Sequence, residues 1–284
     1  MDSNFEKIYD WTNEKLTNEK NNLREFKNET RQIEGLIVAI IILCLIIAFF
    51  APTITAKYIF ITVAILMFII CAFYIFKGER NIIEMQNRFS DFALSELVTH
   101  IKDGFIYERN EEISEINYKK SGFNRIYSTF ESYGLISGDK NNQEISISNI
   151  IVKSEQKELF KGVFAYSTIS GNFDEIDVMN TNCQNNKKEK YDITGLGLYV
   201  YAENMTDARK IITDKVIKYM EQFVNETKIR FELMINKNMI FFRFFDKNIL
   251  TRPISNEKET KEFLYKYYKI IEFISNFSIF LKIK

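Results

Sequence analysis

Proline and histidine are scarce in this chain, whose 284 residues include two prolines and one histidine. Together with only ten glycines, the low proline content argues against long disordered linkers. The lone histidine, His100, cannot supply a histidine-based metal centre, so we predict no metal ligands. A Ser-His-acid triad would also have to use His100, for which we expect a structural or solvent-facing role on a helix.

Cysteine and net charge are also low. Cys44 and Cys71 lie inside apolar runs and Cys183 lies in a polar stretch, with no C-x-x-C motif, which argues against a disulfide framework and a zinc site. The 38 basic and 38 acidic side chains cancel, so the chain lacks a global electrostatic attraction to polyanions. Nucleic acid is therefore not a predicted partner.

Motifs for phosphate binding and nucleophilic catalysis are absent: the sequence contains neither G-x-x-x-x-G-K-S/T nor G-x-S-x-G. The glycine pair in "TGLGLYV" lacks a third glycine and leads into a predicted strand. Carboxylates cluster at 174–177 and 111–112, but glycosidase-type chemistry needs two that converge in a cleft. A solvated strand edge or helix start accounts for them, so we predict no catalytic residues, no cofactor and no enzymatic activity.

Two long apolar runs are the strongest feature of the sequence. No residue between Glu34 and Lys57, or between Lys57 and Lys77, carries a charge. Each run reaches about 30 Å as a helix, the thickness of the hydrocarbon core of a bilayer. We predict a transmembrane hairpin over 34–77, with spans at about 35–54 and 58–76. Because the spans contain no ionisable residue, the hairpin is predicted to be an anchor in the lipid bilayer rather than an ion pathway.

Basic residues near the spans predict the orientation. Arg31 precedes the first span and Lys77 and Arg80 follow the second, whereas the connection offers only Lys57. Positive charge favours the cytoplasmic side. We therefore expect a two-pass protein of the inner (plasma) membrane with both termini in the cytoplasm and the connection outside.

Helices are predicted on both sides of the hairpin. Residues 1–33 form an amphipathic helix in which Tyr9, Leu16 and Leu23 recur every seven residues, and 78–103 forms a juxtamembrane helix with a similar stripe. The two could pair antiparallel as a coiled-coil stalk. Alternatively, the first helix lies on the lipid surface, or is an amphipathic helix packed on the domain.

Residues 104–284 are predicted to form a cytosolic α+β domain with an antiparallel sheet and packed helices, because strand and helix patterns are segregated along this part of the chain. Helical spacing extends over 111–132, and strands follow up to about 203. A helix is expected over 205–226, with Thr206 or Thr213 as its N-cap. The alternation in 229–245, with "NKN" as a turn, predicts a β-hairpin. The last helix is expected to extend to about Ile274.

Few residues in this domain suggest a binding site. Asp207 and Arg209 flank a predicted helix start after a strand, where an anion could bind, although such residues more often cap the helix. The basic stretch 185–190 could contact lipid head groups or an acidic partner, and a solvated loop is the default interpretation.

A series of short motifs follows the spans in a distinctive order. The motifs are "GFNRIYSTFESYGLISG", "ISISNIIV", "LFKGVFAYS", "LYVYAENMTDARKIITDKVIKYM", "FELMINKNMIFFRF", "FDKNILTRPI" and "IIEFISNFSIFLKI". In these motifs the chain resembles a bacterial membrane family, the domain of unknown function 3137 family. The resemblance implies an N-terminal helix, two membrane spans and a cytosolic domain, and it implies no established activity or catalytic residues.

Three functions are compatible with these features. The first is a membrane-anchored cytoplasmic binding module, a scaffold or sensor, with a protein partner or a homo-oligomer as possible assemblies. The second is an enzyme that uses carboxylates or Arg209 in a cleft not visible in the sequence. The third is an oligomerising effector whose hairpins act on the membrane.

Overall fold

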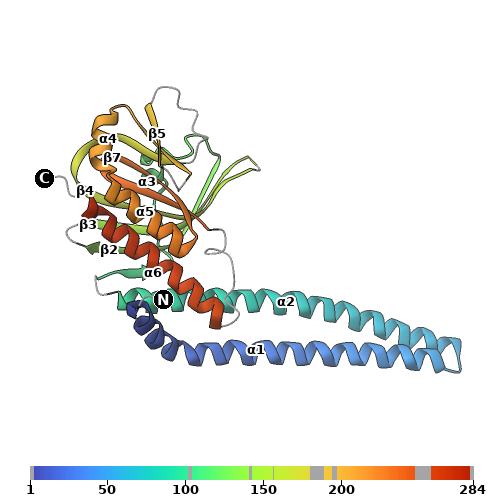
Figure 1. Cartoon of the computed structure of the whole chain (residues 1–284). Coiled ribbons are helices and arrows are strands. Elements are labelled where there is room, and N and C mark those ends of the chain that lie inside the picture. The colour runs from blue at the N-terminus through green and yellow to red at the C-terminus, as the bar shows by residue number, and fades with distance from the viewer. Residues whose placement is uncertain are drawn as a thin grey trace. The chain divides into compact units, whose positions relative to one another are not determined.

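The structure is a computed structural model of the whole chain, drawn in Figure 1. It describes residues 3–101, 104–140, 143–155, 157–179, 189–193, 197–246 and 257–281. The chain divides into two compact units. One comprises Met1–Tyr9, Ala93–Arg252 and Asn256–Lys284, and the other comprises Asp10–Phe92 and Pro253–Ser255.

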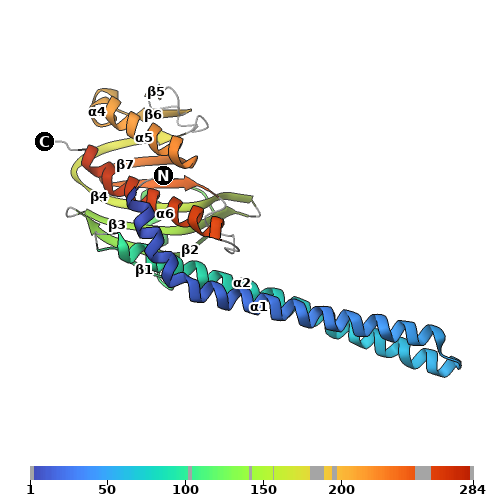
Figure 2. The ribbon, with the colours of Figure 1, turned by 60° about the horizontal axis from the view of Figure 1, so that its bottom comes forward.

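Two long helices, α1 (Ser3–Phe50) and α2 (Ile54–His100), supply most of the smaller unit. They lie side by side in Figures 1 and 2 and touch directly, since a Cβ added to Gly78 would lie 3.0 Å from Cγ2 of Thr30. Pro52 stands between them, where its ring does not interrupt a helix. The two helices are each long and apolar enough to cross a membrane.

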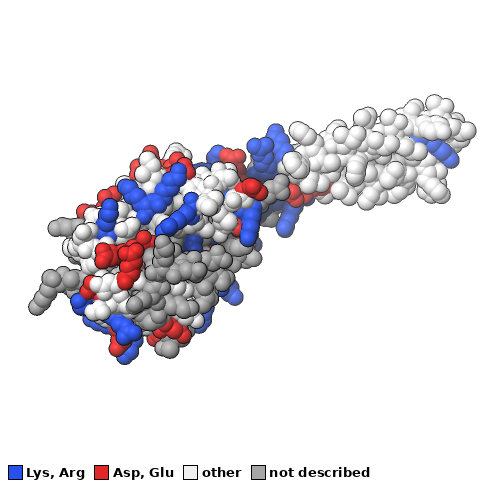
Figure 3. Space-filling model, turned by 90° about the horizontal axis from the view of Figure 1, so that it is seen from above, with Lys and Arg blue, Asp and Glu red and all other residues white. Residues whose placement is uncertain are grey.

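The surface of this hairpin is apolar where the charge-free runs lie. Phe49, Phe73 and Phe76 are each more than 70% exposed. Figure 3 shows this part of the hairpin almost without charged side chains on the visible face. A surface of this kind in water would be a large apolar patch, which soluble monomers rarely expose.

The larger unit is an α+β domain built on an antiparallel sheet, as the sequence predicts. Its strands within the described residues are β1 (Ile106–Glu108), β2 (Thr129–Lys140), β3 (Gln143–Ser154), β4 (Lys157–Met179), β5 (Glu189–Ile193), β6 (Leu198–Ala202) and β7 (Arg230–Phe245). Their order is β1-β2-β3-β4-β6-β5, with β7 paired to β4. The helices are α3 (Glu115–Lys120), α4 (Met205–Ile211), α5 (Asp214–Thr227) and α6 (Glu257–Phe280), together with the ends of α1 and α2.

Strand β4 organises the sheet because it pairs with three other strands. One edge carries β3 along the first part of the strand and β6 along the last part, and β7 follows the opposite edge. The register with β7 shifts between Thr168 and Phe173, where Gly171 has a φ of 122°. A side chain is disfavoured in that conformation, so the glycine permits the irregularity in the strand.

Three local predictions are wrong. The segment 229–245 contains the single strand β7 (Arg230–Phe245) rather than a hairpin, because both halves of the segment pair with the long strand β4. Lys237 (φ 54°) lies at an irregularity in this pairing instead of a turn. The helix predicted over 111–132 is only the short α3, and strand β2 begins at Thr129. The helix predicted over 205–226 is divided into α4 and α5, although one of its two predicted N-caps, Thr213, does cap α5 by accepting a hydrogen bond from the Val216 amide.

Aromatic side chains fill both faces of the sheet. Helices α5 and α6 lie side by side over one face in Figures 1 and 2. There Phe242 and Phe244 of β7 contact Phe273 of α6. On the other face Tyr118 of α3 packs on Phe164 of β4. Burial of each such ring contributes about 1.5–3 kcal/mol, so the rings fix α5 and α6 on the sheet.

The first turns of α1 belong to this domain. The Phe5 ring lies 5.1 Å from the ring of Tyr265 on α6, and Glu6 pairs with Lys261 of α6 at 2.6 Å. The heptad stripe predicted from the sequence is buried at Tyr9, Leu16 and Leu23. The stripe therefore packs partly on the domain and partly within the hairpin.

Candidate functional site

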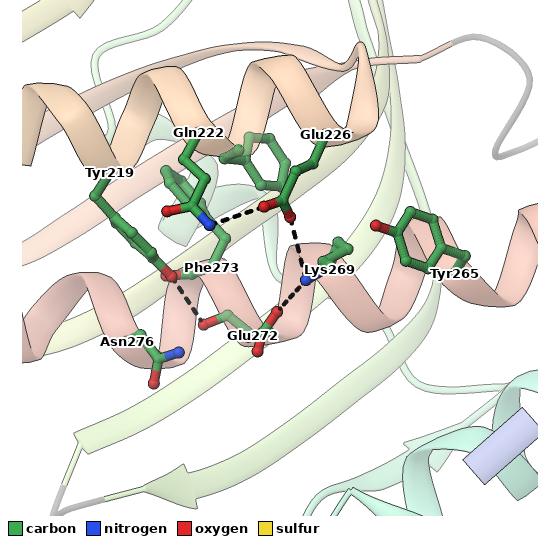
Figure 4. Close-up of a pocket in the computed structure, with 9 residues that line it drawn as sticks. Tyr219, Gln222, Glu226, Tyr265, Lys269, Glu272, Phe273 and Asn276 are labelled. Carbon is green, nitrogen blue, oxygen red and sulfur yellow. Dashed lines mark hydrogen bonds and ion pairs between the residues drawn. The ribbon is translucent and has the colours of Figure 1, made fainter. Parts of the chain in front are cut away.

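A pocket of about 470 Å³ lies between α5 and α6. Helix α5 is held over the sheet by Phe223, whose ring centroid is 4.3 Å from that of Phe273 on α6. One turn earlier, Tyr219 stacks on the same Phe273 ring at 5.2 Å. These rings separate the two helix axes and leave the space above them open between the polar faces of α5 and α6 (Figure 4).

A lysine from α6 lies at the centre of the pocket. The Nζ atom of Lys269 is 2.9 Å from Oε2 of Glu272 and 3.2 Å from Oε2 of Glu226. Gln222 donates a hydrogen bond of 2.8 Å to Oε1 of Glu226. The lysine side chain is 11% exposed, whereas the two glutamate side chains are each 35% exposed. The ammonium group is thus enclosed while its two partners reach solvent.

The pocket carries more negative than positive charge. One ammonium group faces two carboxylates, and the remaining polar groups of the lining are amides and phenols (Figure 4). Burial raises the pKa of Tyr219 above its usual value, and a hydrogen bond with Asn276 partly offsets this effect. The phenol therefore stays neutral at physiological pH and leaves the excess negative charge in place.

A second pocket of about 400 Å³ lies on the other flank of α6. It is lined by Asn4, Lys7 and Ile8 of α1, by His100 and Ile101 at the end of α2, and by Tyr268, Ile271, Glu272, Ser275 and Asn276 of α6. Glu272 and Asn276 line both pockets, so the two hollows share one edge of α6. The start of α1 and the end of α2, which belong to the domain, therefore lie next to the pocket between α5 and α6.

A second, partly buried cation lies on the opposite face of the sheet. Arg243 of β7 pairs with Glu232 at 2.5 Å and donates a hydrogen bond of 2.7 Å to Oδ1 of Asn124. Its guanidinium lies 4.5 Å from the ring centroid of Phe123. Tyr118 donates a hydrogen bond of 3.0 Å to the same Asn124 oxygen. This cluster ties β7 to the segment after α3 and has a structural role.

The residues predicted as a weak binding site lie elsewhere. Asp207 accepts a hydrogen bond from Asn204 at 2.6 Å and pairs with Lys210 at 2.7 Å, so it stabilises the start of α4. Arg209 is exposed on the same short helix. Neither residue lines the pocket between α5 and α6. As the alternative interpretation of the sequence held, the acidic residue helps to cap the helix.

The remaining candidates are placed as follows. The residues predicted to flank the membrane, Arg31, Lys57, Lys77 and Arg80, are exposed on α1 and α2, and their position at a bilayer stays a prediction. His100 is half-buried, with its Nδ1 atom 2.9 Å from the Glu96 carbonyl oxygen. Cys183 and most of the basic stretch 185–190 lie outside the described residues.

Sequence analysis missed Lys269, Glu226 and Glu272. The only local signal is the spacing of Lys269 and Glu272, which places them on one face of a helix. That spacing is common on solvated helices. The contribution of Glu226 depends on the packing of α5 against α6, which periodicity does not reveal.

No protein-family model matches the chain, and no curated protein sequence matches it either. Among solved structures, the chain is similar to the crystal structure of the mycobacterial trehalose monomycolate transport factor A, TtfA. The identity is 11%, the TM-score is 0.35, and the alignment covers 60% of this chain and 86% of that chain. A similarity at this level carries no argument about function.

Proposed function

We propose that the protein is a membrane-anchored binding module, in which a non-catalytic α+β domain binds a small molecule between α5 and α6. The pocket itself carries the proposal. It combines a volume in the range of ligand sites with aromatic walls and a few convergent polar groups. Its charged centre is held in place by hydrogen bonds on both sides of Lys269, so the site is preformed.

The anchor is the second part of the proposal. Helices α1 and α2 would cross the inner (plasma) membrane, with both termini and the α+β domain in the cytoplasm. The exposed apolar side chains of the hairpin support the crossing, and the basic residues beside the spans support the orientation. Membership of the domain of unknown function 3137 family, which the sequence motifs indicate, belongs to the same proposal.

The second pocket supports a sensor rather than a passive scaffold. It is lined by the ends of α1 and α2, and it shares Glu272 and Asn276 with the pocket between α5 and α6. A ligand that moves this edge of α6 would change the surroundings of both helices that lead to the hairpin. A protein partner or a second copy of the chain would then respond to the bound state.

The binding function is tested by purification of the full chain from native membranes in mild detergent, followed by mass spectrometry of bound small molecules and proteins. We expect a stoichiometric small molecule that is lost from Gln222→Trp, in which an indole at the exposed rim blocks the pocket. Glu262→Trp places the same side chain on α6 outside the pocket and should retain the ligand. Chemical turnover of the bound molecule, or equal retention by both variants, would overturn the proposal.

The orientation is tested with single cysteines in a chain whose Cys44, Cys71 and Cys183 are replaced by alanine. Thr53→Cys lies in the connection between α1 and α2, and Ile126→Cys lies in the domain at a side chain that is 85% exposed. A membrane-impermeant maleimide should label the first variant in intact cells and the second only after permeabilisation. The reverse pattern would refute a cytoplasmic domain.

A further inference from the structure

Beside the charged centre of the pocket between α5 and α6, two oxygen atoms remain as hydrogen-bond acceptors. In the described part of the chain, Oε2 of Glu272 accepts from Lys269, whereas Oε1 of the same carboxylate has no hydrogen-bond partner. Gln222 uses one amide N–H toward Glu226, and its side-chain oxygen has no hydrogen-bond partner among the described residues. Lys269 is occupied by both carboxylates. A ligand that engages these two oxygens must therefore donate hydrogen bonds to them.

The charge balance of the site leads to the same chemistry. The enclosed ammonium group of Lys269 neutralises one of two carboxylates, and a unit of negative charge remains on groups that are 35% exposed. A cation gains from this excess, whereas an anion would be repelled by Glu226 and Glu272 and would find the lysine already paired. Charge-assisted hydrogen bonds to a carboxylate are stronger than neutral ones.

Aromatic walls give the ligand a place for an apolar body. Phe223, Phe273 and Tyr265 contribute rings to the lining. The site already holds a cation close to aromatic rings, because Nζ of Lys269 lies 5.8 Å from the ring centroids of Tyr265 and Tyr268. Aromatic faces attract cations and also bury alkyl groups.

We propose that this pocket binds a small organic cation that carries N–H donors, a primary ammonium or a guanidinium, on a short alkyl body. The inference rests on the binding function proposed above and names its ligand class. The cationic group donates to Oε1 of Glu272 and to the Gln222 oxygen, and the alkyl body lies against Phe273. Glu226 stays paired with Lys269 and keeps that lysine away from the ligand.

Titration calorimetry on the full chain in detergent tests the chemistry with four probes. Agmatine and putrescine carry N–H donors, choline is a cation without them, and glutarate is an anion. We expect saturable binding of agmatine or putrescine, binding of choline weaker by about tenfold or more, and no binding of glutarate. Equal affinity for choline, or binding of glutarate in place of the amines, would overturn the assignment.

Two substitutions with a matched control locate the site. Glu272→Gln keeps the shape of the side chain but removes its charge, and should weaken agmatine binding by about tenfold or more. Glu262→Gln makes the same change on α6 at a carboxylate that pairs with Lys266, and should leave binding unchanged. Gln222→Leu provides a second test at an exposed position if Glu272→Gln folds poorly. Equal binding by wild type and both pocket variants would refute this site.

Failure of this inference can be told apart from failure of the proposed function. If the amines do not bind but a neutral or anionic compound from a broader library does, and Gln222→Trp abolishes that binding, the binding function stands and the ligand class is wrong. If no compound and no co-purified molecule depends on the pocket, both proposals are wrong.

Discussion

Two enclosed cations of the α+β domain, Arg243 and Lys269, differ in how far their partners reach solvent. The Arg243 and Glu232 side chains are 14% and 9% exposed, and rings close around the guanidinium. The Lys269 side chain is 11% exposed, but both of its glutamate partners are 35% exposed. Both partners of the arginine pair are largely enclosed by protein atoms, and the pair stabilises the fold. The lysine site is enclosed on one side only and keeps acceptors available for a ligand.

The largest effect on stability is expected when the Arg243 cation is removed. Arg243→Met leaves the Glu232 carboxylate buried without its partner, and should reduce the free energy of unfolding by about 3–5 kcal/mol. Urea unfolding followed by circular dichroism measures this loss. The double variant Arg243→Met/Glu232→Leu removes both charges and should recover most of the stability. A single variant as stable as wild type would show that the cluster is not structural.

A smaller effect on stability is expected from the ionisation of Tyr118, which shares the Asn124 oxygen with Arg243. Burial raises the pKa of Tyr118 to about 12, although Arg243 opposes this rise. Because the folded pKa exceeds the ordinary value of about 10, the stability due to the neutral phenol is complete below pH 10 and is lost as the pH rises toward 12. The loss should amount to roughly 2 kcal/mol in wild type. Tyr118→Phe should show a shallower decline in urea-unfolding experiments over this range, and an unchanged slope would contradict the prediction.

The smallest expected effect is at the open site. Lys269→Met removes the ammonium group, but Glu226 and Glu272 can gain hydration because they already reach solvent. The free energy of unfolding should fall by about 1 kcal/mol, as for partly exposed ion pairs. The same urea experiment measures it. A loss as large as that of Arg243→Met would erase the contrast between the sites and show that Lys269 is also a structural cation.

Much of the fold could be predicted from the sequence because its signals are local. The charge-free stretches before and after Lys57 predict two long apolar helices, and the structure has them. Segregated strand and helix patterns predict the α+β domain with its antiparallel sheet. Residues 231–235 are buried without the alternation expected of a strand with one solvated face. The reason is that helices cover one face of β7 and the α3 segment covers the other.

The pairing partners and the pocket could not be predicted, since both depend on contacts between distant parts of the chain. The alternation in 229–245 suits one long strand as well as a hairpin, and only the length of β4 decides between them. Likewise, Lys269 follows the ordinary periodicity of a helix, and its role is visible only when α5 places Glu226 beside it. Periodicity describes one element and contains no information about its neighbour.

The pairings of β4 impose an order on the folding of the domain during translation. Val163 pairs with Phe244, so the centre of the sheet cannot be completed until β7 has left the ribosome. Helix α6 emerges later still, and only then can Phe5 at the start of α1 meet Tyr265 and Tyr268. Phe5 is therefore buried only after more than 250 further residues have been synthesised. Contacts between residues so far apart in the sequence make folding slow. Until these contacts form, the incomplete sheet exposes unpaired strand edges.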